Sequence, residues 1–443
     1  MICSAYLMFF MCCYDNIGGM KSFSREVNSV RITNASALQS NMAQNKKFFG
    51  FGRNVFFTGL VSFFMDVSSE MIYPLVPLFL ANVLGVNKTM IGLIEGIAES
   101  TASLLKVFSG WLSDRIGQRK SLMLAGYAIS TLSRPIIALA GVWQQVLASR
   151  FVDRVGKGVR TAPRDAIIAE SSETTHLARA FSFHRSMDTM GAVVGPALAL
   201  ILLQLNRNNY QMVFWLSMIP GAIAVVIIVA FIKEKKRSAV ASGVSPRFTL
   251  KHFDAKVRFF ILIVALFALG NSSDAFLILR AEQLGIRPVM IPAVYLLFNL
   301  IYSLSAIPAG MAADRYGKKR IILLGFILFA ALYYGFAVAK SATVIWLLFS
   351  FYGVFMGLTE GIQKAFLSTL IPAEFKATAF GVYASAVGFA TLPASLIGGM
   401  LWDWVSPAAT FYFGAATAIL STIFFTVLIV SIKRASMKTF ISG

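Results

Sequence analysis

Long apolar segments, each bounded by charged or turn residues, follow one another from residue 54 to residue 432. A bilayer core about 30 Å thick needs roughly 20 apolar residues in a helix, so each segment is long enough to cross a membrane once. The segment at 143–165 is the least apolar and is assigned from its place in the series. Twelve transmembrane helices are therefore predicted, at residues 54–80, 89–112, 120–141, 143–165, 178–204, 209–232, 257–279, 288–312, 320–339, 343–369, 376–400 and 407–432.

The composition supports an all-α membrane protein. Hydrophobic residues make up 57% of the 443 residues and charged residues 14%, against roughly 45–50% and about 25% in soluble proteins. These values exclude a water-soluble fold and intrinsic disorder of the whole chain. All 3 cysteines lie before residue 14 and the chain has only 3 histidines, so no disulfide framework, clustered metal site or cofactor is expected.

The net charge of +20 is concentrated in alternate loops. Lys and Arg gather near residues 115–120, 160–179, 233–258, 315–320 and 433–438, whereas the loops between them hold little more than Lys88, Arg207, Arg287 and Lys340. By the positive-inside rule, both termini and the central loop are expected to be cytoplasmic, in the plasma (inner) membrane. The positive charge is thus explained by topology, and nucleic acid is not expected as a partner.

The first 50 residues differ from the rest. Residues 1–14 are apolar but too short to span a bilayer and lack the basic start of a signal peptide, and residues 15–41 are polar without a periodic pattern. Residues 1–50 are therefore expected to be a disordered cytoplasmic extension. Met42 precedes an ordinary lead-in to the first helix and is a second candidate for the start of translation.

A motif that follows the second predicted helix recurs after the eighth. Residues 110–120 read GWLSDRIGQRK, and residues 310–320 read GMAADRYGKKR. The repeat predicts two similar six-helix halves, 51–232 and 257–443, joined by a basic cytoplasmic linker at 233–256. Repeats of this kind usually enclose a central binding site.

The residue types of this motif have physical roles. Its first glycine allows two helix ends to approach closely, its aspartate can accept backbone donors or pair with an arginine, and its second glycine suits a turn with positive φ. The basic residues anchor the turn on the inner side of the membrane. The positions concerned are Gly110, Asp114, Arg115 and Gly117 in the first copy and Gly310, Asp314, Arg315 and Gly317 in the second.

The motif resembles the signature G-x-L-x-D-R-x-G-R-[KR] of the major facilitator superfamily. The first copy departs from it at Gln118, and the second carries Ala312, Ala313 and Lys318. The resemblance covers the chain from about residue 51 to its end and implies two pseudo-symmetric six-helix bundles. It also implies a monomeric secondary transporter that works by alternating access, with the two motif copies holding a cytoplasmic gate when the protein is open outward.

A second element narrows the resemblance. Gly191, Gly195 and Pro196 form a G-x-x-x-G-P sequence in the fifth helix, which is similar to an element of drug:proton antiporters in this superfamily. The later glycine pair of that element is missing. The alternative is ordinary close packing of helices through small residues.

Charged residues inside the predicted helices are candidates for function, because each costs roughly 2.5 kcal/mol or more at the bilayer centre. Asp66 and Glu70 share a face of the first helix, and Arg150, Asp153 and Arg154 lie at comparable depths on the fourth. In the family that the chain resembles, helices 1, 4, 7 and 10 line the cavity. A first-helix acid facing an arginine of the fourth is expected to exchange a proton when substrate disturbs the pair, the alternative being a static ion pair.

The second half has matching candidates. Asp274 lies on the seventh predicted helix, and Glu360, Gln363 and Lys364 lie on the tenth. Substrate binding is one role for these side chains. The alternative is that Glu360 and Lys364 satisfy each other as an i,i+4 pair.

The expected function is secondary active transport of a small organic solute, with protons as the coupling ion. Export of a drug-like or siderophore-like compound is favoured over import of a metabolite or organic anion, and a lipid flippase or membrane receptor on the same fold is the remaining alternative. An enzyme is not expected, because the sequence lacks a metal-protease HExxH motif, a serine–histidine arrangement and a P-loop. The expected partners are the solute, protons and the lipid bilayer.

Overall fold

The computed structural model describes residues 48, 51–116, 118–172, 177–206, 209–234, 253–371 and 376–441. Residues 1–53 and 54–443 form separate units, and the helices discussed here belong to the second unit, apart from Arg53. Almost all of the predicted extension and residues 235–252 of the predicted linker lie outside the described residues.

Helices account for each of the twelve predicted segments. The first half contains α3 (Arg53–Ile72), α4 (Val76–Leu78), η1 (Phe79–Val83), α5 (Lys88–Ile116), α6 (Arg119–Ala138), α7 (Trp143–Glu170), α8 (Leu177–Leu205) and α9 (Tyr210–Phe231). The second half contains α10 (Ala255–Gly270), α11 (Asp274–Gln283), η4 (Pro288–Met290), α12 (Ile291–Tyr316), α13 (Lys318–Val338), α14 (Ala342–Leu367), α15 (Lys376–Trp404) and α16 (Pro407–Ile441). We call these groups the N-terminal half and the C-terminal half.

Nine spans of the described chain are long and apolar enough to cross a membrane by length and composition alone. Helices α5, α6 and α7 are not among them. They carry charged side chains, including Glu95, Arg134, Arg150 and Asp153, which are nonetheless buried between helices. Their low hydropathy therefore reflects polar contacts inside the protein rather than exposure to water.

The apolar pattern indicated one helix for the seventh predicted segment, at 257–279, but the structure has two helices there. α10 ends at Gly270 and α11 begins at Asp274. Between them, the Ser273 side chain caps α11 by accepting a hydrogen bond from the Ala275 backbone N–H at 3.2 Å. Asn and Ser compete with the helix for backbone hydrogen bonds, which explains a break at these residues. Irregular backbone at membrane depth is tolerated where it lines a cavity.

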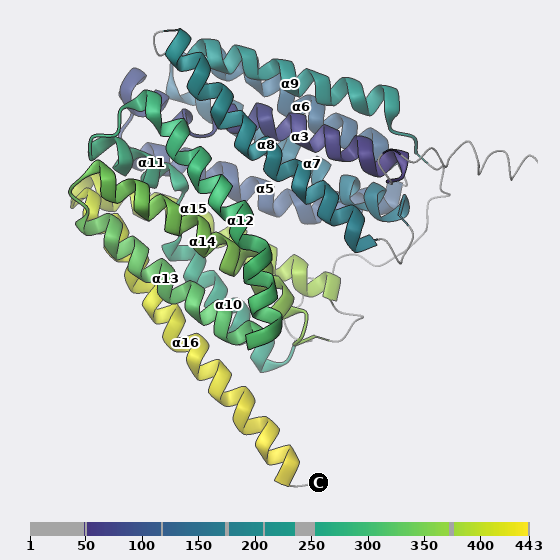
Figure 1. Ribbon diagram of the computed structural model, residues 1–443, viewed down its shortest axis with the longest axis vertical. Coiled ribbons are helices and arrows are strands. Elements are labelled where there is room, and N and C mark those ends of the chain that lie inside the picture. The colour runs from purple at the N-terminus through teal and green to yellow at the C-terminus, as the bar shows by residue number, and fades with distance from the viewer. Residues whose placement is uncertain are drawn as a thin grey trace, which may run out of the picture. The chain divides into compact units, whose positions relative to one another are not determined.

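Two helix pairs make the most extensive contacts between the halves: α5 packs against α15, and α8 against α12 (Figure 1). Small residues allow the first approach. A Cβ at Gly96 would lie 3.0 Å from the Leu392 carbonyl oxygen, and one at Gly388 would lie 2.7 Å from the Ser103 Cβ. Ser100 Oγ donates to the Gly388 carbonyl at 2.7 Å and fixes the register of the pair.

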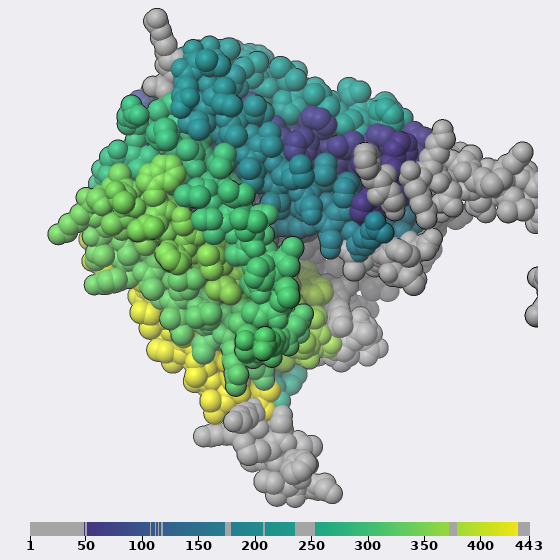
Figure 2. Space-filling model, in the orientation of Figure 1, coloured from purple at the N-terminus to yellow at the C-terminus, as the bar shows by residue number. Residues whose placement is uncertain are grey.

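The second pair is held differently. The Asn299 side chain of α12 donates to the Ala192 carbonyl of α8 at 3.1 Å. Figure 2 shows the teal surface of the N-terminal half against the green surface of the C-terminal half along this seam.

The ends of the helices fall into two sets. We call the end at which α5, α7 and α12 finish the basic end, and the end at which η1, α11 and α15 finish the opposite end. At the opposite end, Asp403 accepts a hydrogen bond from the Thr89 backbone N–H at 2.7 Å, and the Asn82 amide donates to Glu282 at 2.5 Å. These two contacts join the halves there.

Candidate functional site

A buried ion pair connects α7 with α5. The Arg150 guanidinium donates from Nε to Glu95 Oε1 at 3.0 Å and from Nη2 to Glu95 Oε2 at 2.5 Å. Both side chains are almost fully buried. The two parallel hydrogen bonds give this pair a fixed geometry, and each group offsets the cost of burying the other.

Arg154 forms the next ion pair along α7. Its Nη2 lies 2.7 Å from Glu99 Oε1, and its Nη1 lies 3.6 Å from Asp153 Oδ2. Asp153 also lies 3.2 Å from the Nη2 of Arg134, a buried residue of α6. These four side chains form a network of alternating charge across three helices.

The first-helix acids are not the partners of these arginines. The prediction that Asp66 or Glu70 pairs with Arg150 or Arg154 is therefore wrong in its partner, because Glu95 and Glu99 of α5 occupy that role. Within the described chain, Asp66 and Glu70 form no ion pair. Glu70 Oε2 is buried and has no hydrogen-bond partner among the described residues.

The acids of α3 nevertheless line a cavity with those arginines. This arginine cavity has a volume of about 200 Å³ and also contains Lys157. Tyr73 covers the arginines, with their guanidinium carbons 5.4 Å and 5.9 Å from its ring centre. The complete lining is Asp66, Ser69, Glu70, Tyr73, Glu99, Arg150, Asp153, Arg154, Lys157, Arg160 and Tyr295.

The glycines of α8 set the position of α3. A Cβ at Gly191 would lie 2.8 Å from the Cβ of Asp66, and one at Gly195 would lie 2.8 Å from the Cβ of Glu70. Both distances are too short for real atoms, so only glycine permits this approach. Pro196 follows inside α8 without ending it. The G-x-x-x-G-P element thus packs against the two acids.

A larger cavity lies between the halves. This central cavity has a volume of about 420 Å³ and shares Tyr73 and Glu99 with the arginine cavity. Asp274 lies on its wall and accepts a hydrogen bond from the Tyr352 hydroxyl at 2.9 Å. Gln363, another predicted residue, accepts one from the Tyr383 hydroxyl at 2.8 Å.

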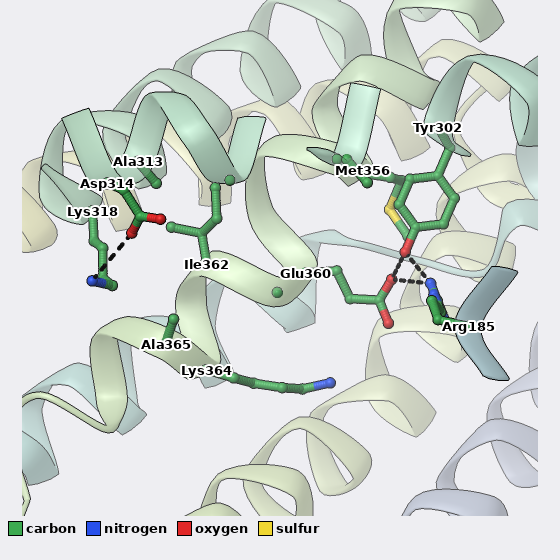
Figure 3. A pocket seen from close by; sticks show the side chains of 14 residues that line it. Arg185, Tyr302, Ala313, Asp314, Lys318, Met356, Glu360, Ile362, Lys364 and Ala365 are labelled. Atoms are coloured by element: carbon green, nitrogen blue, oxygen red, sulfur yellow. Dashed lines mark hydrogen bonds and ion pairs between the residues drawn. The ribbon is translucent and has the colours of Figure 1, made fainter. Parts of the chain in front are cut away.

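Glu360 links the two halves. Its carboxylate accepts a short hydrogen bond from the Tyr302 hydroxyl, and the Arg185 guanidinium of α8 donates a short hydrogen bond to the same hydroxyl (Figure 3). Arg185 Nη2 lies 3.6 Å from Glu360 Oε2. Lys364 forms no ion pair within the described residues, so the alternative of a mutual Glu360–Lys364 pair does not apply here.

A third cavity opens beside this link. This vestibule cavity has a volume of about 490 Å³, shares Glu360 and Lys364 with the central cavity, and reaches Gly310 and Asp314 of the second motif copy. Its lining thus extends from residues of the central cavity to residues near the basic end. The described polar contacts between the halves lie at the opposite end or near the middle of the helices.

The second motif copy agrees with the sequence analysis at Gly317 and differs from it at Gly310. Gly317 has φ of +93°, as the motif predicts. Asp314 lies 3.8 Å from Lys318 in an exposed pair, and Arg315 stacks on Tyr316 with its guanidinium carbon 5.3 Å from the ring centre. A Cβ at Gly310 would meet nothing within 4 Å, so the expected close approach of helix ends is not made there.

The first motif copy is only partly described. A Cβ at Gly110 would lie 3.4 Å from the Cβ of Ala162, which is an ordinary contact between α5 and α7. Arg115 lies in the last turn of α5. The side chain of Asp114 and the whole of Gly117 lie outside the described residues.

The structure thus brings the predicted residues into two neighbouring sites. Asp66, Glu70, Arg150, Asp153 and Arg154 gather at the arginine cavity, whereas Asp274, Glu360, Gln363 and Lys364 line the central cavity. The predicted set of site residues omitted four residues that form hydrogen bonds or ion pairs with its members: Glu95, Glu99, Tyr302 and Tyr352. Glu95 and Glu99 carried a usable signal, because two acids one turn apart in a predicted transmembrane helix require partners.

Comparisons with known proteins agree with this architecture. The family model of the Major Facilitator Superfamily matches residues 58–281 and 259–440. A protein of Methanocaldococcus jannaschii, named an uncharacterized MFS-type transporter, is 35% identical over 398 residues, which cover 88% of this chain and 98% of the relative. The multi-drug resistance efflux pump PmrA homolog of Lactococcus lactis is 25% identical over 375 residues, covering 80% of this chain and 89% of the relative.

Solved structures show the same fold at low sequence identity. A POT family transporter in complex with 5-aminolevulinic acid has a TM-score of 0.73 and 14% identity, covering 86% of this chain and 97% of that one. The nucleoside transporter NupG has a TM-score of 0.73 and 12% identity, covering 85% and 99%. The predicted fold of twelve transmembrane helices is thus confirmed. With both halves matched by the family model, the chain belongs to the Major Facilitator Superfamily and is a multi-pass membrane transporter, not an enzyme.

Proposed function

We propose that this transporter couples the movement of a small organic solute to protons, and that Asp66 and Glu70 carry them. The supporting observation is that the two arginines nearest these acids along the cavity wall are paired with other carboxylates. Arg150 and Arg154 line the same cavity but are already paired with Glu95 and Glu99. The α3 acids therefore retain carboxyl groups without a fixed cation, which can bind and release protons as the cavity changes its access to water.

The same proposal assigns the membrane orientation. The basic loops favour a cytoplasmic location of the basic end and of both termini, in the plasma (inner) membrane. The halves are joined by Asp403–Thr89 and Asn82–Glu282 at the opposite end, and the vestibule cavity reaches the basic end. This supports an inward-facing state, in which the cytoplasmic gate of the two motif copies is not closed.

Export of a drug-like or siderophore-like compound is the favoured direction. Its support is the packing of Gly191 and Gly195 against the α3 acids, since this element is similar to one in drug:proton antiporters. The efflux pump named among the relatives supports it as well. Import of an organic anion is the second candidate, because Lys157 and Lys364 face cavities without an ion-pair partner in the described chain.

Proton coupling can be measured in proteoliposomes loaded with the pH-sensitive dye pyranine. A panel of organic cations, zwitterions and anions would be added, and the expected result is a solute-dependent proton flux. That flux should be lost in Asp66→Asn or Glu70→Gln but kept in Asp254→Asn, which removes an exposed acid at the start of α10. Undiminished flux in both α3 variants would contradict the assignment of the coupling acids. Movement of fluorescent lipid, or binding without counterflow, would favour a flippase or a receptor instead.

A further inference from the structure

The break between α10 and α11 presents an unusual carboxylate to the central cavity. Asp274 is the first residue of α11, where the positive end of the helix dipole favours a negative charge. Its only hydrogen bond in the described structure comes from the Tyr352 hydroxyl, and no cationic side chain pairs with it there. A carboxylate at membrane depth that faces a cavity without a cation is suited to a cationic ligand.

The polar atoms around Asp274 leave hydrogen-bond acceptors for a ligand. Tyr352 donates to Asp274, and Tyr333 donates to Asn271 Oδ1 at 3.3 Å, so these hydroxyl protons are already used. Ser272 Oγ lines the cavity, is buried and has no hydrogen-bond partner among the described residues. An ammonium group has three donors and no acceptor and therefore complements this surface.

The walls of the central cavity suit a cation with an apolar body. Five aromatic side chains line it: Tyr73, Phe267, Tyr352, Phe355 and Tyr383. Aromatic faces attract cations and also bury apolar groups. The volume of about 420 Å³ is in the range of small-molecule sites.

The charges that line the central cavity can be sorted by their partners. Glu99 is paired with Arg154, and Glu360 with Arg185. Asp274 and Lys364 are then the two charged groups of the described lining without an ion pair. The cavity therefore offers one negative and one positive group to a ligand.

These two groups lie far apart. Tyr352, which contacts Asp274, and Lys364 are twelve residues apart on α14, a rise of about 18 Å at 1.5 Å per residue. The reach of the Asp274 and Lys364 side chains makes the gap between their charges shorter than this rise, but it remains several bonds long. Adjacent ligand charges, as in an α-amino acid, cannot meet both groups at once.

We propose that the central cavity binds an elongated zwitterion, with its ammonium group at Asp274 and its anionic group at Lys364. The aromatic walls hold the apolar segment between the two charges. This proposal rests on the transport function proposed above and names its substrate class. It assigns recognition to the C-terminal half, whereas the proton-carrying acids lie in the N-terminal half.

A series of ω-amino acids of increasing length tests the proposed separation between the two binding groups. The probes are 4-aminobutanoic, 6-aminohexanoic, 8-aminooctanoic and 12-aminododecanoic acid, with octylamine and octanoic acid as single-charge controls. Binding is measured as the rise in melting temperature of the detergent-solubilised full-length protein, without a pH gradient. The longer zwitterions are expected to bind about tenfold more tightly than 4-aminobutanoic acid and than either single-charge control.

Variants assign the two ends of the probe. Asp274→Asn should remove the preference for 8-aminooctanoic over octanoic acid, and Lys364→Gln the preference for 8-aminooctanoic acid over octylamine. Asp274→Glu, which keeps the charge, should retain binding and so reports whether the site is folded, and Asp254→Asn should behave as wild type.

Two outcomes overturn the proposal: none of the four ω-amino acids stabilises the protein, or the stabilisation is the same in Asp274→Asn and wild type. If zwitterions bind but no proton flux is measured, the proposed proton coupling is wrong and the binding proposal stands. The two results are independent because the binding assay involves no gradient.

Discussion

Gly195 of α8 lies directly against Glu70 of α3, so that a Cβ at residue 195 would be 2.8 Å from the Glu70 Cβ. One helical turn earlier, Gly191 makes the same contact with Asp66. The element that resembles an antiporter signature is thus packed on the acids to which we assign proton transfer. Its glycines keep α3 and α8 close, and close packing limits how far the acids can move relative to the rest of the N-terminal half.

Adding a methyl group at either glycine should therefore disturb transport. Gly195→Ala and Gly191→Ala are each expected to lower stability by about 1–3 kcal/mol, because the surrounding helices must shift. Proton flux in pyranine-loaded proteoliposomes should fall severalfold even where folded protein is recovered. Gly141→Ala is the matched control, since a Cβ at Gly141 would meet nothing within 4 Å. Wild-type flux in Gly195→Ala would show that this packing does not control the acids.

The buried pair between Arg150 and Glu95 should be more important for stability than for coupling. Removing one partner, as in Glu95→Gln, leaves an uncompensated charge at depth and is expected to cost about 3–5 kcal/mol. The double variant Glu95→Gln with Arg150→Met removes both charges and should recover much of this loss. Apparent melting temperatures of the purified variants provide the measurement.

The control for that pair is Asp165→Asn. Asp165 pairs with Arg164 at 2.9 Å, but its side chain is 38% exposed, so the expected loss is below about 1 kcal/mol. A double variant no more stable than Glu95→Gln alone would argue against a mutual role of the two charges.

The sequence predicted the helices well and the ion pairs poorly. Segment ends follow from local composition, which is why the ranges of α9, α13 and α14 agree with the predicted segments to within a few residues. The partner of Arg150 depends instead on how α5 and α7 are rotated about their axes, which the depth of a residue in its helix does not determine. The break at Asn271–Ser273 was missed because two serines and one asparagine hardly change the mean hydropathy of a long apolar segment.

Contacts at the opposite end should determine the balance between the two access states. Asp403 accepts hydrogen bonds from the backbone N–H and the hydroxyl of Thr89, both at 2.7 Å, and so ties α15 to the start of α5. Charge-assisted bonds of this kind contribute about 1.5–3 kcal/mol. Asp403→Asn is therefore expected to increase the population open at the opposite end by about tenfold or more.

A cysteine probe can report this shift. Ser395 is fully buried between α5 and α15, so Ser395→Cys should react slowly with a membrane-impermeant maleimide in the wild-type background. Adding Asp403→Asn should raise the labelling rate by about the same factor as the open population, whereas adding Asp254→Asn should not. Equal labelling rates with and without Asp403→Asn would contradict a role for this contact in closing the opposite end.

Substitutions at the two glycines of the second motif copy should have different effects, one on stability and the other on transport. Gly317 has φ of +93°, which is unfavourable for other residues, so Gly317→Ala is expected to lower stability by about 1–2 kcal/mol. Gly310 has open space around it in this structure, and Gly310→Ala should leave the melting temperature unchanged. If the motif copies approach each other when the gate closes, the added methyl group should obstruct only that state. Gly310→Ala is then expected to slow solute-dependent proton flux severalfold at wild-type stability, and normal flux would show that no close contact forms at Gly310 during the cycle.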